Sequence, residues 1–477
     1  MAHRLTLLTL LTLSGSLVAL SSPHETYSAS LARARTNPDG SNPGVLVNIS
    51  KLPKTVEVNI TATVTSLSMQ PGVTTEAFAY NGQVPGPTLD VREGDHVIVH
   101  FRNDLPEPTT VHWHGIHLPF ESDGSPFHPI KPGETHDYQF TVRPGTAGTY
   151  WYHPHPDHRT GFAIGKGLFG GIIVRAADDP LPAMQEKLLI LSDNRFLHDG
   201  AIDFPDPASH HGGIDEENGR EGPVLFVNGH VMPTITIRSG EVQRWRVVNA
   251  SAGRIYRIAL PGYTFVEIGS DGGLLEAPRE VKEVLLATGE RVELLVRGTG
   301  APGSKAVLQN LSYDRYAPQT RPKDWNTILD LLTLQTTNET PVAALAIPST
   351  LRKITALDTT KVTAVRTVVF GQGMINGKLM DMARVDVSTK VGATEIWEIE
   401  NIVGMDHPFH LHGFQFQVLD RDGVPEPYRA WKDMLNIPKH STARIIVRYD
   451  DYPGKWMFHC HILDHEDHGM MGVLEVK

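Results

Sequence analysis

The chain has little of several common features. It has 477 residues but one cysteine, which excludes an intrachain disulfide. Its 43 Lys and Arg are outnumbered by 54 Asp and Glu, and the net charge of −11 argues against general nucleic-acid or anionic-membrane binding. Amphipathic helical patterns are scarce, and no segment after Leu20 is apolar enough to cross a bilayer. We therefore expect a soluble monomer without a nucleic-acid or membrane partner.

The N-terminus has the features of an export signal. Arg4 precedes a short apolar stretch, Leu5–Leu20, and small residues follow it. The stretch is shorter than the ~20 residues that a membrane anchor needs, and Gly15 interrupts it. We predict a cleaved signal peptide at 1–22, a disordered polar lead-in at 23–44, and export to the periplasm or secretion.

A weak internal repeat divides the rest of the chain. Asn-Gly pairs begin at Asn81, Asn228 and Asn376, almost evenly spaced, with similar residues after each. At roughly 150 residues per domain, the chain length also favours three domains. The predicted domains are 45–177, 178–342 and 343–477.

Strand-like patterns occur in each copy of the repeat. Apolar and polar residues alternate in Thr55–Thr65, His96–Phe101, Thr234–Ile237 and Ala443–Val447. This period of two, with β-branched residues and frequent Gly and Pro turns, indicates antiparallel sheets. We predict an all-β fold of three β-sandwich domains. Residues 198–222 are expected to form a long acidic surface loop.

Ten of the 24 histidines lie in four short segments that each contain a His-x-His pair. On a strand, residues i and i+2 point to the same face, so each pair can present two imidazoles to one point. A single such pair is commonly a surface strand with structural histidines, but four pairs indicate a metal site. The segments begin at His112 (HWHG), His153 (HPH), His407 (HPFHLHG) and His459 (HCHILDH).

The fourth segment combines a thiol with imidazoles. On a strand, His459 and His461 share one face and Cys460 takes the other, so two metal centres can lie on opposite sides. A His₂Cys set with a weak axial Met is typical of a blue copper site. Its members would be His407, Cys460, His465 and Met470. Zinc also accepts Cys and His, but it does not change oxidation state and makes no use of a second centre.

The four segments, in their order along the chain, resemble the four copper-binding motifs of the multicopper oxidases. They read HWHG, HPH, HPFHLHG and HCHILDHEDHGM. The order of the motifs is that of three-domain laccase-like enzymes of the spore-coat laccase and copper-efflux oxidase type. The resemblance covers essentially the whole mature chain and implies three cupredoxin-like Greek-key β-sandwich domains. It also implies four copper ions, one of type 1, one of type 2 and two of type 3, with dioxygen as the electron acceptor.

The resemblance further implies a role for each ligand. The type 1 copper takes His407, Cys460, His465 and Met470, and the type 2 copper takes His112 and His410. One type 3 ion takes His114, His153 and His459, and the other takes His155, His412 and His461, with His459 and His461 open to exchange. The trinuclear site would lie between the outer domains, with the second domain as a spacer. Electrons would pass from the type 1 copper through Cys460 and a flanking histidine.

Two acidic residues, Asp123 and Glu466, match positions that the family uses to deliver protons to the cluster. Both could also be ordinary loop residues.

One departure from the family pattern concerns methionine. Some copper-efflux oxidases carry a Met-rich insertion, whereas here only Met374, Met380 and Met382 gather loosely. This departure weakens the case for a dedicated cuprous oxidase.

The leading functional hypothesis is a laccase-like enzyme that oxidises phenols or aromatic amines with dioxygen. The alternative is a metallo-oxidase acting on Cu(I), Mn(II) or Fe(II), because the acidic segment Asp215–Glu221 and the carboxylates beside His465 could attract cations. A third interpretation is a copper-binding scaffold that has lost catalysis. Twelve filled ligand positions argue against it.

Overall fold

The computed structural model describes residues 42–206 and 208–477. The predicted signal peptide at 1–22 and the lead-in up to residue 41 lie outside these residues. The end of the lead-in is ordered, because Asn42 Oδ1 accepts a hydrogen bond from the Leu188 N–H at 2.9 Å. The Gly44 carbonyl accepts another from the Thr88 N–H. The prediction of disorder does not hold for 42–44, because the Asn42 side chain and the Gly44 backbone are hydrogen-bonded to the second and first sandwiches.

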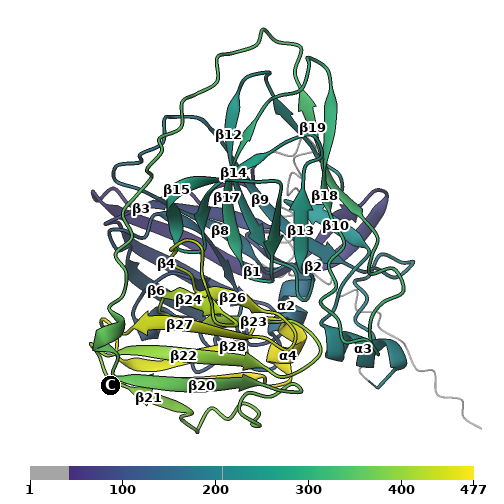
Figure 1. Cartoon of the computed structure of the whole chain (residues 1–477). Coiled ribbons are helices and arrows are strands. Elements are labelled where there is room, and N and C mark those ends of the chain that lie inside the picture. Colours follow the sequence, from purple (N-terminus) through teal and green to yellow (C-terminus); the bar gives the residue numbers. More distant parts are fainter. Residues whose placement is uncertain (1–41, 207) are drawn as a thin grey trace, which may run out of the picture.

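The described chain forms three β-sandwiches of two sheets each (Figure 1). The first has the sheets β2-β1-β4-β6 and β3-β8-β7-β5. Its strands are β1 (Thr55–Gln70), β2 (Val73–Tyr80), β3 (Gly86–Arg92), β4 (His96–Asp104), β5 (His112–His114), β6 (Thr135–Thr141), β7 (Gly148–His153) and β8 (Gly170–Arg175). A 3-10 turn η1 (Phe120–Ser122) and the helix α2 (Thr160–Lys166) complete it.

The second sandwich has the sheets β10-β9-β12-β17-β14-β15 and β11-β19-β18-β13-β16. Its strands are β9 (Gln185–Asn194), β10 (Val224–Val227), β11 (Thr234–Ile237), β12 (Val242–Asn249), β13 (Tyr256–Ala259), β14 (Phe265–Ser270), β15 (Gly273–Val281), β16 (Glu283–Leu286), β17 (Arg291–Arg297), β18 (Lys305–Asn310) and β19 (Leu329–Thr336). The helix α3 (His210–Asn218) lies between β9 and β10.

The third sandwich has the sheets β20-β22-β27-β24-β25 and β21-β29-β28-β23-β26. Its strands are β20 (Ala364–Phe370), β21 (Val387–Thr389), β22 (Thr394–Asn401), β23 (His407–Leu411), β24 (Phe416–Arg421), β25 (Val424–Pro425), β26 (Met434–Ile437), β27 (Thr442–Arg448), β28 (Gly454–Cys460) and β29 (Met471–Val476). The turn η2 (Thr359–Lys361) precedes it, and the helix α4 (Leu463–Asp467) follows β28.

The predicted acidic loop at 198–222 is wrong in part, because it contains α3. Ser209 begins this helix by accepting a hydrogen bond from the Gly212 N–H at 3.0 Å, as N-cap serines do. Asp215 and Arg220 of the segment are buried. Two adjacent glycines at Gly212 and Gly213 conceal the helix at the sequence level, since glycine disfavours helices.

The weak repeat corresponds to equivalent turns. The three Asn residues of the Asn-Gly pairs have φ values of 51°, 53° and 52°, in the left-handed region that asparagine tolerates. Each side-chain oxygen accepts a hydrogen bond from a strand N–H: Asn81 from Thr61, Asn228 from Ile190 and Asn376 from Val369. The same local chemistry therefore recurs once in every sandwich.

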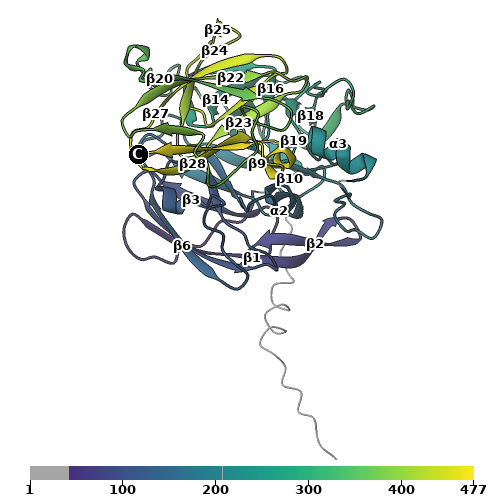
Figure 2. The ribbon, with the colours of Figure 1, turned by 90° about the horizontal axis from the view of Figure 1, so that it is seen from below.

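Each sandwich has its own apolar core, with a buried tryptophan in each: Trp113, Trp245 and Trp397. Figure 2 shows the third sandwich, in green to yellow, lying over the first, in purple to blue, and α4 packs on α2. Within residues 42–206 and 208–477, no helix is long and apolar enough to cross a membrane.

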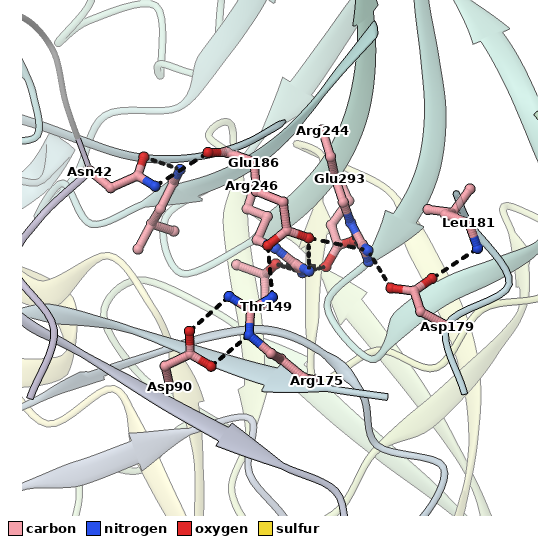
Figure 3. A network of polar contacts seen from close by, with 11 residues as sticks. Asn42, Asp90, Thr149, Arg175, Asp179, Leu181, Glu186, Arg244, Arg246 and Glu293 are labelled. Atoms are coloured by element: carbon pink, nitrogen blue, oxygen red, sulfur yellow. Dashed lines mark hydrogen bonds and ion pairs between the residues drawn. The ribbon is translucent and has the colours of Figure 1, made fainter. Parts of the chain in front are cut away.

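A largely buried polar network connects the first two sandwiches (Figure 3), where Arg175 of β8 lies 2.9 Å from Glu186 of β9. Arg246 contacts Glu293 at 2.6 Å, Glu186 at 2.8 Å and the Thr149 hydroxyl at 3.1 Å. Because the side chains of Arg246 and Glu293 are almost fully buried, removing one partner would leave the other charge uncompensated.

Candidate metal centre

Two pairs of neighbouring strands carry most of the predicted ligands. In the first sandwich β5 pairs with β7, which places His112 opposite His153. In the third, β23 pairs with β28, which places His410 opposite His459. The two sandwiches meet at these strands, where the rings of His114 and His410 stack at 3.9 Å between centroids. Eight buried histidines thus converge from both ends of the chain.

Several of these imidazoles use one nitrogen to donate to a fixed oxygen. His112 Nδ1 lies 2.8 Å from the Asp123 carbonyl, and His410 Nδ1 lies 2.9 Å from the Asp433 carbonyl. A neutral imidazole that donates at one nitrogen keeps a lone pair at the other. The Nε2 atoms of His112 and His410 are buried and have no hydrogen-bond partner among the described residues. Leaving them unpaired is costly, and a metal ion would remove that cost.

The ligand atoms gather in three histidine groups, each within 4.8 Å. They are His112, His114 and His410; His114, His153 and His461; and His155, His412 and His459. The resemblance implied that His114, His153 and His459 hold one type 3 ion. The structure corrects this grouping, because His461 and not His459 lies with His114 and His153. His459 Nε2 instead lies 3.1 Å from His412 Nε2 and 3.4 Å from His155 Nε2.

Burial favours the neutral form of several of these imidazoles. It lowers the pKa of His155 to about 4 and that of His461 to about 3. It also holds the pKa of His114, His410 and His412 well below the ordinary value. Taking a cation out of water disfavours the protonated ring, so the lone pairs are available to a metal at neutral pH.

The two predicted carboxylates both reach the histidine groups. Asp123 Oδ2 lies 3.0 Å from His412 Nδ1. The oxygens of Glu466 lie 3.3 Å from His155 Nε2 and 3.2 Å from His459 Nδ1. Among the described residues, neither Glu466 oxygen makes a well-aligned hydrogen bond. Both therefore retain capacity to accept one.

A separate cysteine group consists of His407, Cys460 and His465, whose ligand atoms also lie within 4.8 Å. Cys460 Sγ is 3.6 Å from His465 Nδ1. Met470 is buried in the same core as Cys460, and its carbonyl accepts a hydrogen bond from the Cys460 N–H. Burial raises the pKa of the thiol, so a bound cation is needed to displace its proton. A soft metal with imidazole and thiolate ligands fits this group.

Sequence comparisons cover most of the chain. Three family profiles described as multicopper oxidase match residues 61–179, 176–324 and 348–477. "Multicopper oxidase mco" of Staphylococcus aureus is 33% identical over 414 residues, 84% of this chain and 83% of that protein. This chain belongs to the multicopper oxidase family.

Two further relatives extend the comparison. The laccase of Bacillus subtilis is 28% identical, with 84% of this chain and 90% of that protein aligned. The solved structure "Multicopper oxidase from Campylobacter jejuni: a metallo-oxidase" superposes with a TM-score of 0.84 at 31% identity, covering 92% of this chain and 96% of that one. The protein is therefore an oxidoreductase that uses dioxygen, with type 1, 2 and 3 copper and cupredoxin-fold sandwiches.

Sequence reasoning missed two residues of this multicopper oxidase that lie beside the histidine groups, Asp433 and Arg291. Asp433 Oδ1 lies 3.0 Å from His114 Nε2, and Arg291 pairs with Asp433. Neither belongs to a His-x-His segment. One indirect signal exists in the HWHG motif, because a Cβ at Gly115 would lie 2.4 Å from Arg291 Nη2.

Proposed function

We propose that this multicopper oxidase couples the one-electron oxidation of phenols or aromatic amines to the four-electron reduction of dioxygen to water. The type 1 copper would be held by His407, Cys460, His465 and Met470, and the type 2 copper by His112 and His410. The type 3 pair would be held by His114, His153 and His461 on one ion and by His155, His412 and His459 on the other. Bound copper would supply the one-electron redox chemistry and the site for dioxygen.

A cavity beside the cysteine group supports the proposed choice of substrate. It has a volume of about 920 Å³, and Glu217 and Asn218 of α3 contribute to its lining. His465 is almost fully buried, and its Nε2 donates to the Glu217 carbonyl at 3.0 Å. A reductant held in this cavity would thus be one hydrogen bond away from a proposed type 1 ligand.

The lining of the cavity favours an aromatic reductant over a free cation. Tyr316 and Trp325 line it, and ring faces attract other aromatic groups. Two of its carboxylates already have cationic partners, since Asp215 lies 2.5 Å from Arg195 and Glu221 lies 2.5 Å from Arg315. A metal ion would gain little binding free energy from carboxylates that arginines already neutralise.

Proton delivery would fall to the two buried carboxylates. Glu466 bridges His155 and His459, and Asp123 contacts His412. Each lies within reach of imidazoles that surround the dioxygen site. Acids held at such distances can transfer protons to a reacting oxygen directly or through water.

The second candidate is a metallo-oxidase. The structural relative from Campylobacter jejuni is described as one, and Glu217 remains exposed on the cavity side of α3. Oxidation of Cu(I), Mn(II) or Fe(II) would then serve metal detoxification or homeostasis.

Oxygen uptake by the copper-loaded enzyme separates the two candidates. We expect turnover of a simple phenol to exceed turnover of Cu(I), and negligible phenol turnover at saturating copper would contradict the proposal. A blocking variant, Gly213→Phe, sharpens the test, since a Cβ there meets nothing within 4 Å and Gly213 lines the cavity. It should raise KM for a bulky phenol, whereas the exposed control Val424→Phe should not.

We also propose export of the protein, on the basis of the apolar stretch Leu5–Leu20, and action as a monomer. Fractionation with N-terminal sequencing of the mature chain tests the first proposal. An intact N-terminus in the cytoplasm would contradict it. Light scattering tests the second, and a stable dimer would contradict it.

A further inference from the structure

The second sandwich contributes an arginine to the centre of the molecule. Arg291 begins β17, and its side chain is fully buried. All five guanidinium N–H donors are used. Nε donates to the Thr149 carbonyl at 3.2 Å, Nη1 to the Gly289 carbonyl at 3.0 Å, and Nη2 to the Asp271 carbonyl at 3.0 Å. The remaining two donors form a bidentate pair with the Asp433 carboxylate at 2.7 and 2.5 Å.

These partners belong to all three sandwiches. Thr149 lies in β7 of the first, Gly289 and Asp271 belong to the second, and Asp433 precedes β26 of the third. A planar guanidinium has fixed donor directions. Arg291 therefore sets the position of Asp433 relative to the other two domains.

Asp433 in turn holds two histidines from different domains. Its Oδ1 lies 3.0 Å from His114 Nε2, and its carbonyl lies 2.9 Å from His410 Nδ1. With these nitrogens donating, the lone pairs of His114 Nδ1 and His410 Nε2 face the histidine groups. Partners of this kind orient metal-binding imidazoles and fix their tautomers.

Two glycines pack closely against this network. A Cβ at Gly115 would lie 2.6 Å from Asp433 Oδ2, and one at Gly289 would lie 3.1 Å from His461 Nε2. Both glycines have positive φ, at 85° and 81°. The Thr288 hydroxyl also donates to the His461 carbonyl at 2.6 Å. The turn before β17 thus forms one wall of the histidine groups.

We propose that Arg291 is a positioning residue for the type 2 copper, acting through Asp433 on His114 and His410. The second domain then does more than space the outer two, because it orients ligands that it does not itself supply. This inference rests on the proposed assignment of His410 to the type 2 copper and of His114 to the neighbouring type 3 ion.

The test compares Arg291→Lys with the matched control Arg246→Lys. Both variants replace a buried guanidinium of the second sandwich that also reaches Thr149 of the first, and both keep the charge. The hydrogen bonds of Arg246 go to Thr149, Glu293 and Glu186 and not to a histidine of the groups. Copper content, the type 2 EPR signal and the type 1 blue absorption are measured on each copper-loaded variant. For Arg291→Lys we expect the type 2 signal to change and the affinity for that ion to fall by about tenfold or more. The blue absorption should remain, and Arg246→Lys should keep both signals.

A second variant protects the test against misfolding. Asp433→Asn keeps the size of the side chain and an oxygen for His114, but it cannot form the charged pair with Arg291. It should change the type 2 signal in the same way. A native type 2 signal and copper content in either folded variant would overturn the inference while leaving the proposed function intact. Absence of a type 2 signal in the wild-type protein would overturn the ligand assignment and this inference with it.

Discussion

His459 and Cys460 are neighbours in β28, yet their side chains enter two different groups of ligand atoms. Cys460 Sγ lies with His407 and His465, and His459 Nε2 lies with His155 and His412. The alternation of side chains along a strand produces this division. A single peptide unit therefore connects the proposed type 1 and trinuclear sites.

Replacing Cys460 by serine tests this connection. Serine keeps the shape but removes the soft thiolate that copper prefers. Cys460→Ser should abolish the blue absorption and all oxidase turnover, while the type 2 EPR signal persists as an internal control. Retention of either the blue colour or turnover would refute the type 1 assignment.

Removing His410, an imidazole of the proposed trinuclear site, should have the opposite effect on the type 2 signal and the blue absorption. His410→Ala deletes a ring whose Nε2 has no partner among the described residues, so the type 2 signal should disappear and oxygen uptake should stop. Much of the blue absorption should survive, because His410 is not part of the cysteine group. The exposed His198→Ala serves as control. Normal oxygen uptake by His410→Ala would contradict the assignment.

The buried carboxylate Glu466 should matter for turnover rather than for copper binding. Glu466→Gln preserves its volume but removes its ability to carry a proton between His155 and His459. Turnover should fall by about 100-fold or more, in the range of general acid catalysis. Anaerobic reduction of the blue copper should keep its rate. Glu475→Gln, on the neighbouring strand β29, is the matched control, and equal turnover in both variants would exclude the relay.

The copper-free protein should lose stability in mild acid. Burial lowers the pKa of His155 and of His465 to about 4, whereas an unfolded histidine titrates near about 6.5. Between these values the unfolded chain takes up protons that the folded chain does not, so the free energy of unfolding falls as pH falls. Each histidine contributes about 3 kcal/mol to that loss.

Urea unfolding of the copper-free protein at a series of pH values measures this effect. The loss should lie between about pH 6.5 and about pH 4 and should level off below. His465→Gln removes one of the titrating groups and should reduce it. A free energy of unfolding that stays constant or rises as the pH falls through this range would show that the histidines are not buried in the neutral form.

Much of the site can be predicted from the sequence because its chemistry depends on residues close together in the chain. A His-x-His pair on a strand presents both rings to one face whatever the rest of the fold does. The Asn-Gly turns at Asn81, Asn228 and Asn376 likewise depend on backbone preferences of the residues themselves. The fold class and the repeat follow from such short-range rules, and the family follows from the resemblance of four short motifs.

Other features depend on contacts between distant segments. Whether His459 or His461 joins His114 is decided by how β28 faces β5 and β7 across the domain interface. The cavity lies close to His465 because α3, which contributes to its lining, packs on α4 of the third domain.

The sequence alone determined which residue types could bind copper and in which four segments they occur. Only the tertiary structure decided which nitrogen is free in a ring such as that of His114, because that depends on an oxygen far away in the chain. His114 and Asp433 are 319 residues apart, and Arg291 holds Asp433 in place through donors that reach all three domains. Such partners carry no motif, since burial and geometry rather than spacing bring them together.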